Sequence, residues 1–180
     1  MIDVRSRLLD LFKTRAVAFG DFTLASGQKS SYYINSKKVL FHSEAAWLLG
    51  EMLWQATNDL DITAVGGLEI GAIPMAAVTA MRYHDHGRTL EGFFVRKQTK
   101  GHGSQSLIEG DLKPGDRVAV LDDVLTTGES ALRAVKAVEA AGAVVARVVC
   151  IVDRLQGARE TLVGYDFRPL FTIRDLGIGG

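Results

Sequence analysis

The sequence contains almost no cysteine and no long apolar run. Cys150 is the only cysteine among 180 residues, so an internal disulfide and a cysteine-ligated metal site are both excluded. It lies in the apolar stretch VVCIV, where we expect a buried and unreactive thiol. No segment approaches the roughly 18 to 20 uninterrupted apolar residues of a membrane span, and the opening residues MIDVRSRLLDL are too charged for a secretion signal. We therefore expect a cytoplasmic protein with no membrane partner.

The sequence also lacks an excess of either charge. Its 21 Lys and Arg residues balance 21 Asp and Glu residues, so no global field draws the protein to nucleic acid. A site for an anionic ligand must therefore be built locally. With 47% hydrophobic residues, a chain of this length buries about two thirds or more of its unfolded surface. We expect one domain over residues 1–180.

Two common nucleotide-binding motifs are missing as well. The chain has no G-x-x-x-x-G-K-[ST] phosphate loop, and VGGLEIGA lacks the G-x-G-x-x-G spacing of dinucleotide-binding proteins. The sequence therefore disfavours two functions, nucleotide hydrolysis on a phosphate loop and dinucleotide binding.

Strand and helix patterns alternate along most of the chain. Apolar spacing predicts a first helix over residues 4–19 that ends at Gly20, and FTLASGQKSSYYINS predicts two short strands around a turn at 26–30. The later predicted elements are a helix at 44–57, the strand ITAVGG running into a glycine turn, a helix at 72–83, strands at 92–97 and 117–123, a helix at 129–141 and a strand at 144–154. This alternation predicts an α/β fold with a doubly wound, mostly parallel sheet.

Two segments stand apart from this alternation. KQTKGHGSQSLIEGDLKPGD, at 97–116, is rich in glycine and has little periodicity. Loops beyond about 12 to 15 residues are rare in compact domains unless they bind, cover a site or are disordered. Near the end of the chain, PLFTI predicts one more strand outside the alternation.

The most informative stretch is VAVLDDVLTTGES, at 118–130. The apolar run predicts a central parallel strand, and Asp122 and Asp123 follow at its carboxyl end. Ligands of open α/β sheets bind beyond the carboxyl ends of strands, so both acids are expected to face a crevice. The alternative interpretation is a solvated strand end before an ordinary helix, which the complete string disfavours.

The residues after the acids predict an anion site. Thr126, Thr127 and Gly128 form the first turn of the next helix, where free N–H groups and the helix dipole favour a phosphate. Hydroxyls of Thr126, Thr127 and Ser130 add donors. Carboxylates beside a phosphate are tolerated if they accept hydrogen bonds from sugar hydroxyls. A ribose 5-phosphate fits both requirements.

The same string resembles the phosphoribosyl pyrophosphate signature of type I phosphoribosyltransferases. The segments FGDFTLASGQKSSYYIN, GGLEIGAIPMA, FFVRKQTKGHG and VDRLQGARE narrow the resemblance to the orotate phosphoribosyltransferase family. It implies a core over residues 41–165, a small hood from residues 1–40 plus 166–180, and a mobile loop over 97–111. By resemblance the phosphoribosyl pyrophosphate site comprises Arg96, Lys97, Lys100, His102, Asp122, Asp123, Val124, Leu125, Thr126, Thr127, Gly128, Glu129 and Ser130.

The resemblance also implies chemical roles. Lys100 and His102, on a loop that closes over the pyrophosphate, would act in catalysis together with Asp122 and Asp123. Arg154 and Thr126 would bind orotate, Arg154 through its planar fork for a carboxylate. The implied cofactor is Mg²⁺, held mainly by substrate oxygens and water, with no metal site of the protein's own. The implied assembly is a homodimer with shared active sites.

Some positions depart from the family pattern. One branch carries lysines where this chain has Ala25 and Gly71, so neither role is transferred. Either Tyr32 or Tyr33 could contact the base. The other lysines near the first site, Lys29, Lys37 and Lys38, are expected to be solvated. A purine phosphoribosyltransferase and a non-catalytic regulator that binds phosphoribosyl pyrophosphate remain the alternative functions.

Overall fold

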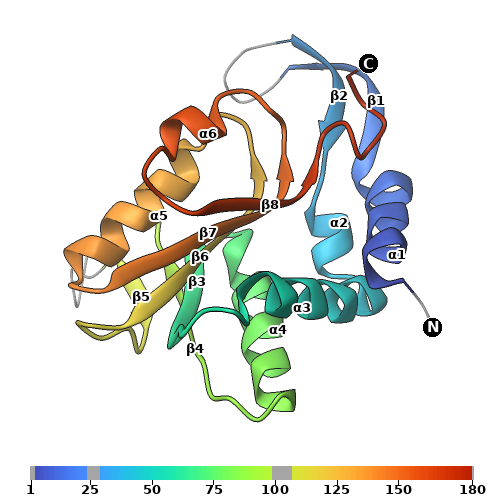
Figure 1. The fold of residues 1–180 in the computed structure, drawn as a ribbon. Helices are drawn as coiled ribbons and strands as arrows, with labels where there is room; N and C mark the ends of the chain where they lie inside the picture. The colour runs from blue at the N-terminus through green and yellow to red at the C-terminus, as the bar shows by residue number, and fades with distance from the viewer. Residues whose placement is uncertain (1–2, 24–28, 99–106, 180) are drawn as a thin grey trace.

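A six-stranded sheet forms the centre of the molecule. The computed structural model describes residues 3–23, 29–98 and 107–179. The sheet has the strand order β5-β4-β3-β6-β7-β8, and within it β5 runs antiparallel to β4 while the other neighbours are parallel (Figure 1). Its strands are β3 (Ala64–Leu68), β4 (Glu91–Val95), β5 (Ile108–Gly110), β6 (Arg117–Leu125), β7 (Val144–Asp153) and β8 (Phe167–Thr172). The predicted α/β class with a mostly parallel sheet is confirmed.

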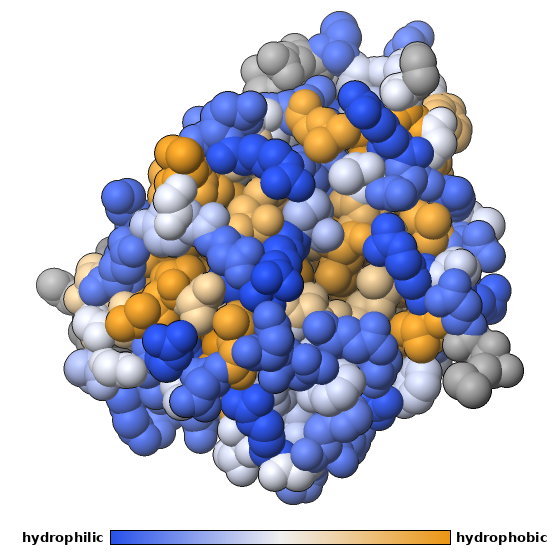
Figure 2. Space-filling model, viewed as in Figure 1, coloured by the Kyte–Doolittle hydropathy of each residue, from blue (hydrophilic) through white to orange (hydrophobic). Residues whose placement is uncertain are grey.

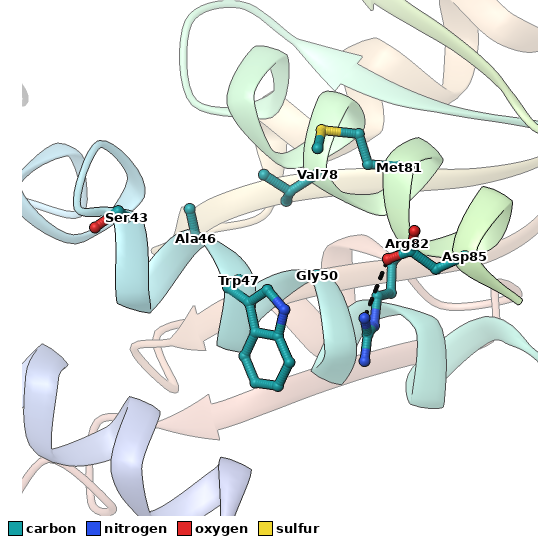
Figure 3. A pocket seen from close by; sticks show the side chains of 8 residues that line it. All are labelled: Ser43, Ala46, Trp47, Gly50, Val78, Met81, Arg82 and Asp85. Carbon is teal, nitrogen blue, oxygen red and sulfur yellow. Dashed lines mark hydrogen bonds and ion pairs between the residues drawn. The ribbon is translucent and has the colours of Figure 1, made fainter.

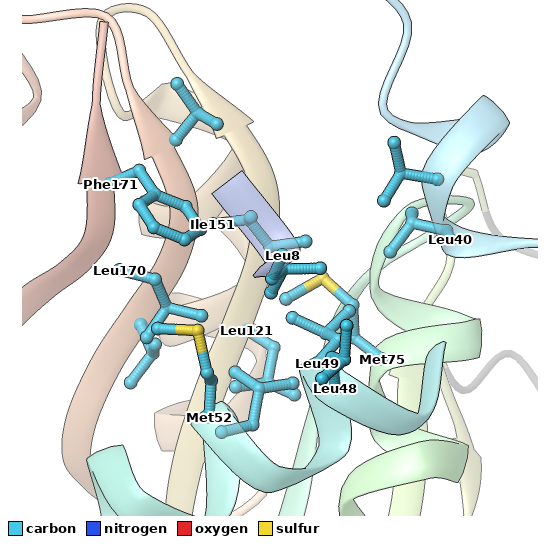
Figure 4. Close-up of a cluster of buried hydrophobic side chains, with 14 of the residues drawn as sticks. Leu8, Leu40, Leu48, Leu49, Met52, Met75, Leu121, Ile151, Leu170 and Phe171 are labelled. Carbon is cyan, nitrogen blue, oxygen red and sulfur yellow. The ribbon is translucent and has the colours of Figure 1, made fainter. Parts of the chain in front are cut away.

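Helices cover both faces of this sheet. The helical elements are α1 (Val4–Leu11), the π-helical turn η1 (Phe12–Ala16), α2 (Lys37–Leu40), α3 (Ser43–Thr57), α4 (Ala72–Asp85), α5 (Glu129–Ala140) and α6 (Ala158–Thr161). Successive side chains of β6 point to opposite faces, so Leu121 packs with α1, α3 and α4 in one core cluster (Figure 4). Val118 and Val120 pack with α5 and α6 in the other cluster.

The N-terminal segment differs from its sequence-based prediction. The pattern predicts a helix over 4–19 ended by Gly20, but helical structure ends at Ala16 and Gly20 lies inside β1 (Val17–Thr23). β1 pairs antiparallel with β2 (Lys29–Ile34) on both sides of a register shift between Phe19 and Phe22, and this tertiary pairing overrides the apolar spacing. The two strands form a separate hairpin above the edge of the main sheet (Figure 1). The predicted turn at 26–30 lies largely outside the described residues.

Most central elements match their predicted bounds, with one difference at the glycines of β3. ITAVGG predicts a strand running into a glycine turn, whereas Gly66 and Gly67 pair with β4 as part of the strand. A Cβ on Gly67 would lie 1.9 Å from the carbonyl oxygen of Leu121. The glycines therefore allow the central strands to approach, and the turn follows at residues 69–71.

Two further predictions need correction in part. PLFTI was predicted to lie outside the alternation, and the hood to include 166–180, but β8 pairs in parallel with β7 at the sheet edge. The loop prediction over 97–111 also includes β5, which pairs with β4 at Phe93 to Val95.

On the face shown in Figure 2, apolar patches alternate with polar ones. Among the helices in the described part of the chain, none has the length and apolarity that crossing a membrane requires.

Candidate active site

The candidate site lies where several strands reach the same edge of the sheet. Because β3, β6 and β7 are parallel, their carboxyl ends place residues 69–71, 122–130 and 153–155 close together. The start of α2 approaches the same place, because Ser36 before the helix and Lys37 at its first position both contact Asp123. Elements far apart in the chain therefore meet around the acidic pair.

Asp122 is an almost fully buried carboxyl group. Its residue is 6% exposed, and its Oδ2 accepts a hydrogen bond of 2.6 Å from the hydroxyl of Ser130. Its Oδ1 accepts a 2.8 Å bond from the backbone N–H of Asp123. Burial, followed by the nearby charge of Asp123, raises the pKa of Asp122 to about 7. This group therefore titrates near neutral pH, unlike an exposed aspartate.

Asp123 sits in a different environment. Its Oδ2 accepts a hydrogen bond from the hydroxyl of Ser36 and lies 3.4 Å from the ammonium of Lys37, while Oδ1 accepts a 3.0 Å bond from the N–H of Val124. Burial acts to raise the pKa of Asp123, but the hydroxyl, the ammonium and the backbone N–H outweigh it and lower that pKa. The two neighbouring acids thus have their pKa values pushed apart.

The turn before α5 has the features of an anion site. Gly128 precedes the helix with φ of 85°, and no side chain caps the helix start. The first N–H groups of a helix lack intrahelical partners and carry its positive end. A Cβ on Gly128 would lie 3.1 Å from Cα of Ala158, in a left-handed conformation that favours glycine. Thr126 is partly buried and Thr127 is exposed.

Other members of the predicted donor site have different surroundings. Leu125 is fully buried in the core beneath α5, so its side chain faces away from the crevice. Val124 packs partly against the opposite core cluster, and Glu129 is exposed. The hydroxyl of Ser130 is directed to Asp122. For Val124 and Leu125 it is the backbone that borders the site.

Arg154 follows β7 at the same sheet edge and reaches the hairpin. Its Nε donates a 3.1 Å hydrogen bond to the hydroxyl of Tyr32, and its guanidinium carbon lies 4.8 Å from the centroid of that ring. Tyr33 instead packs on Phe22, with ring centroids 5.7 Å apart. Of the two tyrosines, Tyr32 is therefore the one beside the predicted carboxylate-binding arginine.

The predicted basic loop is only partly described. Arg96 Nη1 lies 3.2 Å from Glu109. The backbone N–H of Lys97 donates a 2.8 Å bond to Glu69, and its carbonyl accepts a 3.0 Å bond from Arg133. These bonds anchor the first residues of the loop beside the turn after β3. Lys100 and His102 lie outside the described residues.

The site includes residues that the sequence pattern does not reveal. Lys37 is exposed, as expected from sequence, but its ammonium also lies 3.4 Å from Asp123. Ser36 is 2% exposed beneath the same carboxylate. A Cβ on Gly71 would lie 2.5 Å from Cγ of Asp123. In the sequence, only the adjacent Lys37 and Lys38 indicate a possible cation here. They do not predict which carboxylate the cation contacts.

This arrangement suits a ligand that is both anionic and rich in hydroxyls. Buried carboxylates accept hydroxyl donors, and the uncapped α5 terminus accepts an anion. No group of three or more His, Cys, Asp or Glu side chains placed to hold a metal ion occurs in the described ranges. Mg²⁺ usually keeps several waters and binds substrate phosphates, and the remaining lone pairs of Asp122 and Asp123 fit hydrogen bonds from such waters.

Comparisons with known proteins identify the family of this chain. A model of the phosphoribosyl transferase domain family matches residues 37–167. The orotate phosphoribosyltransferase of Corynebacterium glutamicum is 43% identical over 179 residues, covering 98% of this chain and 96% of that protein. The orotate phosphoribosyltransferase of Streptomyces avermitilis is 44% identical over 181 residues, covering 99% of this chain and 100% of that protein.

Solved structures lead to the same family. The crystal structure of the Mycobacterium tuberculosis orotate phosphoribosyltransferase in complex with 5-phospho-α-D-ribosyl 1-diphosphate aligns with a TM-score of 0.83 at 37% identity. The alignment covers 97% of this chain and 99% of that one. Fold and sequence thus agree, and this chain belongs to the orotate phosphoribosyltransferase family of phosphoribosyl transferases.

Proposed function

We propose that this protein transfers ribose 5-phosphate from phosphoribosyl pyrophosphate to a ring nitrogen of orotate, releasing pyrophosphate and forming orotidine 5′-monophosphate. The observation that carries this proposal is the placement of Asp122 and Asp123 directly before the uncapped start of α5. The donor's 5′-phosphate binds the N–H groups of this turn, and its ribose hydroxyls donate to the acids. One ligand then satisfies both halves of the site.

Orotate binding is supported by the arginine at the end of β7. Its guanidinium offers a planar pair of donors that matches a carboxylate, and Arg154 uses its Nε to bond Tyr32. The terminal nitrogens of Arg154 are then directed by this contact toward the orotate carboxylate. Thr126, partly buried at the same edge, completes the contact to the base.

The reaction depends on positioning and electrostatics. Orotate is an anion with a fairly nucleophilic ring nitrogen, so holding it against the sugar carbon supplies most of the catalysis without a dedicated base. Bond cleavage leaves positive charge on the sugar and negative charge on the pyrophosphate. Asp122 and Asp123 hold the sugar hydroxyls, and bound Mg²⁺ would neutralise charge on the leaving group.

The basic loop contributes cations to the departing pyrophosphate. Arg96 and Lys97 begin this segment, and Lys97 is tied to Glu69 and Arg133 through its backbone, which leaves its exposed side chain available. Lys100 and His102 act next along the chain, in the part outside the described residues. Closure of this loop excludes water while the bond breaks.

A homodimer is supported by an apolar surface on α3 and α4. Trp47 and Met81 are 57% and 69% exposed, and they line a cavity of about 210 Å³ with Val78 and Arg82 (Figure 3). Contiguous exposed apolar groups of this kind mark association surfaces. In the dimer, the basic loop of one subunit serves the site of the other.

Subunit mixing tests this arrangement. A Lys100→Ala subunit and an Asp123→Asn subunit, each nearly inactive alone, should recover activity when combined, because one site per mixed dimer is intact. Absence of recovery in mixed dimers proven by differential tags would contradict loop sharing. Sedimentation of Met81→Glu should give monomers; a stable dimer of this variant would contradict the α3–α4 surface.

A substrate panel tests the reaction itself. The protein is incubated with phosphoribosyl pyrophosphate, Mg²⁺ and orotate, adenine, guanine or hypoxanthine, while base consumption and pyrophosphate release are both followed. The proposal expects consumption of orotate only, with one pyrophosphate released per nucleotide. Consumption of a purine instead would support a purine phosphoribosyltransferase, and tight donor binding without release from any base would support the regulator.

A further inference from the structure

We propose that Ser36 and Lys37 form a positioning pair that orients the Asp123 carboxylate for the ribose hydroxyls of the donor. This inference rests on the proposed function, because it assigns Asp123 to the sugar. Ser36 precedes α2 and Lys37 is its first residue, and they lie 87 and 86 positions away from Asp123 in the chain. The hairpin region thereby controls a carboxylate of the core sheet.

The contacts divide the two oxygens of Asp123. Oδ2 accepts from the Ser36 hydroxyl and faces the Lys37 ammonium at 3.4 Å. Oδ1 accepts from the N–H of Val124 at 3.0 Å. A carboxylate oxygen has two lone-pair sites; Asp123 also shares a side-chain hydrogen bond with Asp122, and the acceptor sites that remain are available to a ligand. Because Ser36 and Lys37 hold Oδ2 in place, they also set the direction in which the remaining acceptor sites of the carboxylate point.

The opposite side of the carboxylate has no room for another side chain. Atoms of Asp123 would lie 2.5 to 2.8 Å from a Cβ on Gly71, closer than real Cβ contacts. Gly71 ends the turn before α4 as its N-cap, so at this position only backbone atoms meet Asp123. The cation beside this acid is therefore supplied by Lys37 from α2.

Charge explains why an ammonium is useful here. The charged groups that face the Asp123 carboxylate are Asp122 on the same strand and Lys37 on α2. Two neighbouring carboxylates repel each other when both are ionised. Lys37 offsets this repulsion and keeps Asp123 as the acceptor of the pair. Ser36, at 2% exposure, supplies a donor that is shielded from water.

Lys38 provides a matched control. It is the next residue in α2, it is exposed, and its side chain makes no ion pair within the described part of the chain. Lys37→Met and Lys38→Met remove the same charge from the same helix. Only Lys37→Met also removes the ammonium that lies beside Asp123.

The test compares steady-state kinetics of Lys37→Met, Lys37→Arg and Lys38→Met with those of the unchanged protein. Loss of a charge-assisted contact should lower kcat/KM for phosphoribosyl pyrophosphate about tenfold or more, with KM for orotate changed less than about twofold. Lys37→Arg should restore most of the loss, and Lys38→Met should show none. Equal kinetics of Lys37→Met and Lys38→Met would overturn the inference.

A second readout separates positioning from a structural effect. Removing the ammonium raises the pKa of Asp123, so the acidic limb of kcat/KM for the donor should move to higher pH in Lys37→Met but not in Lys38→Met. An unmoved limb would also overturn the inference. If the unchanged protein consumes no orotate, the proposed reaction fails instead. In that case calorimetric binding of phosphoribosyl pyrophosphate to the same variants still decides the role of Lys37.

Discussion

The guanidinium of Arg154 is held by the ring and hydroxyl of Tyr32, at 4.8 Å from the ring centroid and 3.1 Å from the oxygen. The contact joins the end of β7 to the hairpin. An arginine positioned in this way has lost much of its rotamer freedom before any ligand arrives, which lowers the entropic cost of binding a carboxylate. The hairpin therefore contributes Tyr32 to the proposed orotate site.

Replacing Arg154 with methionine should selectively weaken orotate binding. The change removes a charge-assisted, two-donor contact, so KM for orotate should rise by about tenfold to a hundredfold. The dissociation constant of phosphoribosyl pyrophosphate, measured by calorimetry, should stay within about twofold. Tyr32→Phe, which keeps the ring but removes the hydroxyl, should give a smaller increase of about threefold to tenfold. Equal effects on both substrates would contradict the carboxylate role.

Adding a single methyl group at Gly71 should disturb Asp123 without harming the fold. The backbone of Gly71 is helical, with φ of −60° and ψ of −39°, so alanine is conformationally allowed there. Its Cβ would nevertheless lie 2.5 Å from Cγ of Asp123, and the carboxylate must move. Gly71→Ala should therefore keep its melting temperature within about 3 °C and lose about tenfold or more in kcat/KM for the donor. Gly92→Ala, whose Cβ has open space, is the control.

Asp122 should make stability fall as pH rises through neutrality. Its folded-state pKa is raised to about 7 from 3.8, so between these values the folded protein holds a proton that the unfolded chain has released. The stabilisation is fully present below the unfolded pKa and is lost as pH rises through the folded pKa.

Asp122→Asn cannot ionise and should escape this loss. Its melting temperature relative to the unchanged protein should be higher at about pH 8.5 than at about pH 5, by about 2 °C or more. Asp10→Asn, at an exposed position on α1, controls for general charge effects. A difference in melting temperature that is independent of pH would show that Asp122 is not a buried acid.

Lys100 should act on the chemical step. Neutralising it in Lys100→Ala removes a cation from the departing pyrophosphate, so kcat should fall about a hundredfold while the dissociation constant of orotate stays nearly constant. Lys13→Ala, at an exposed position on η1, serves as the control. Unchanged turnover in Lys100→Ala would refute the role of this residue.

The main sheet is largely predictable from sequence because its strands are continuous apolar runs followed by helices of regular period. Val118 to Leu121 and Val148 to Val152 are buried on both faces, which is the pattern of a central parallel strand. The boundaries at Gly20 and Gly66–Gly67 are not predictable in the same way. Glycine often ends an element. Only the tertiary structure reveals these as strand positions, since Gly20 lies where the register of β1 with β2 shifts and Gly66 and Gly67 pair with β4.

The candidate site is also predictable only in part. One short motif holds Asp122, Asp123 and the turn at Thr126 to Gly128, so the sequence alone predicts that they lie together. Ser36 and Lys37 are far from that motif in sequence and have no periodicity that distinguishes them from solvated neighbours. Their contact with Asp123 depends on how the hairpin region folds over the sheet edge, which local pattern does not encode.

The most direct measurement is a crystal structure of the protein with phosphoribosyl pyrophosphate and Mg²⁺. The 5′-phosphate should accept hydrogen bonds from backbone N–H groups of residues 126–130, and the ribose hydroxyls should donate to Asp122 and Asp123. A donor bound elsewhere, with both carboxylates directed into bulk water, would contradict the proposed site.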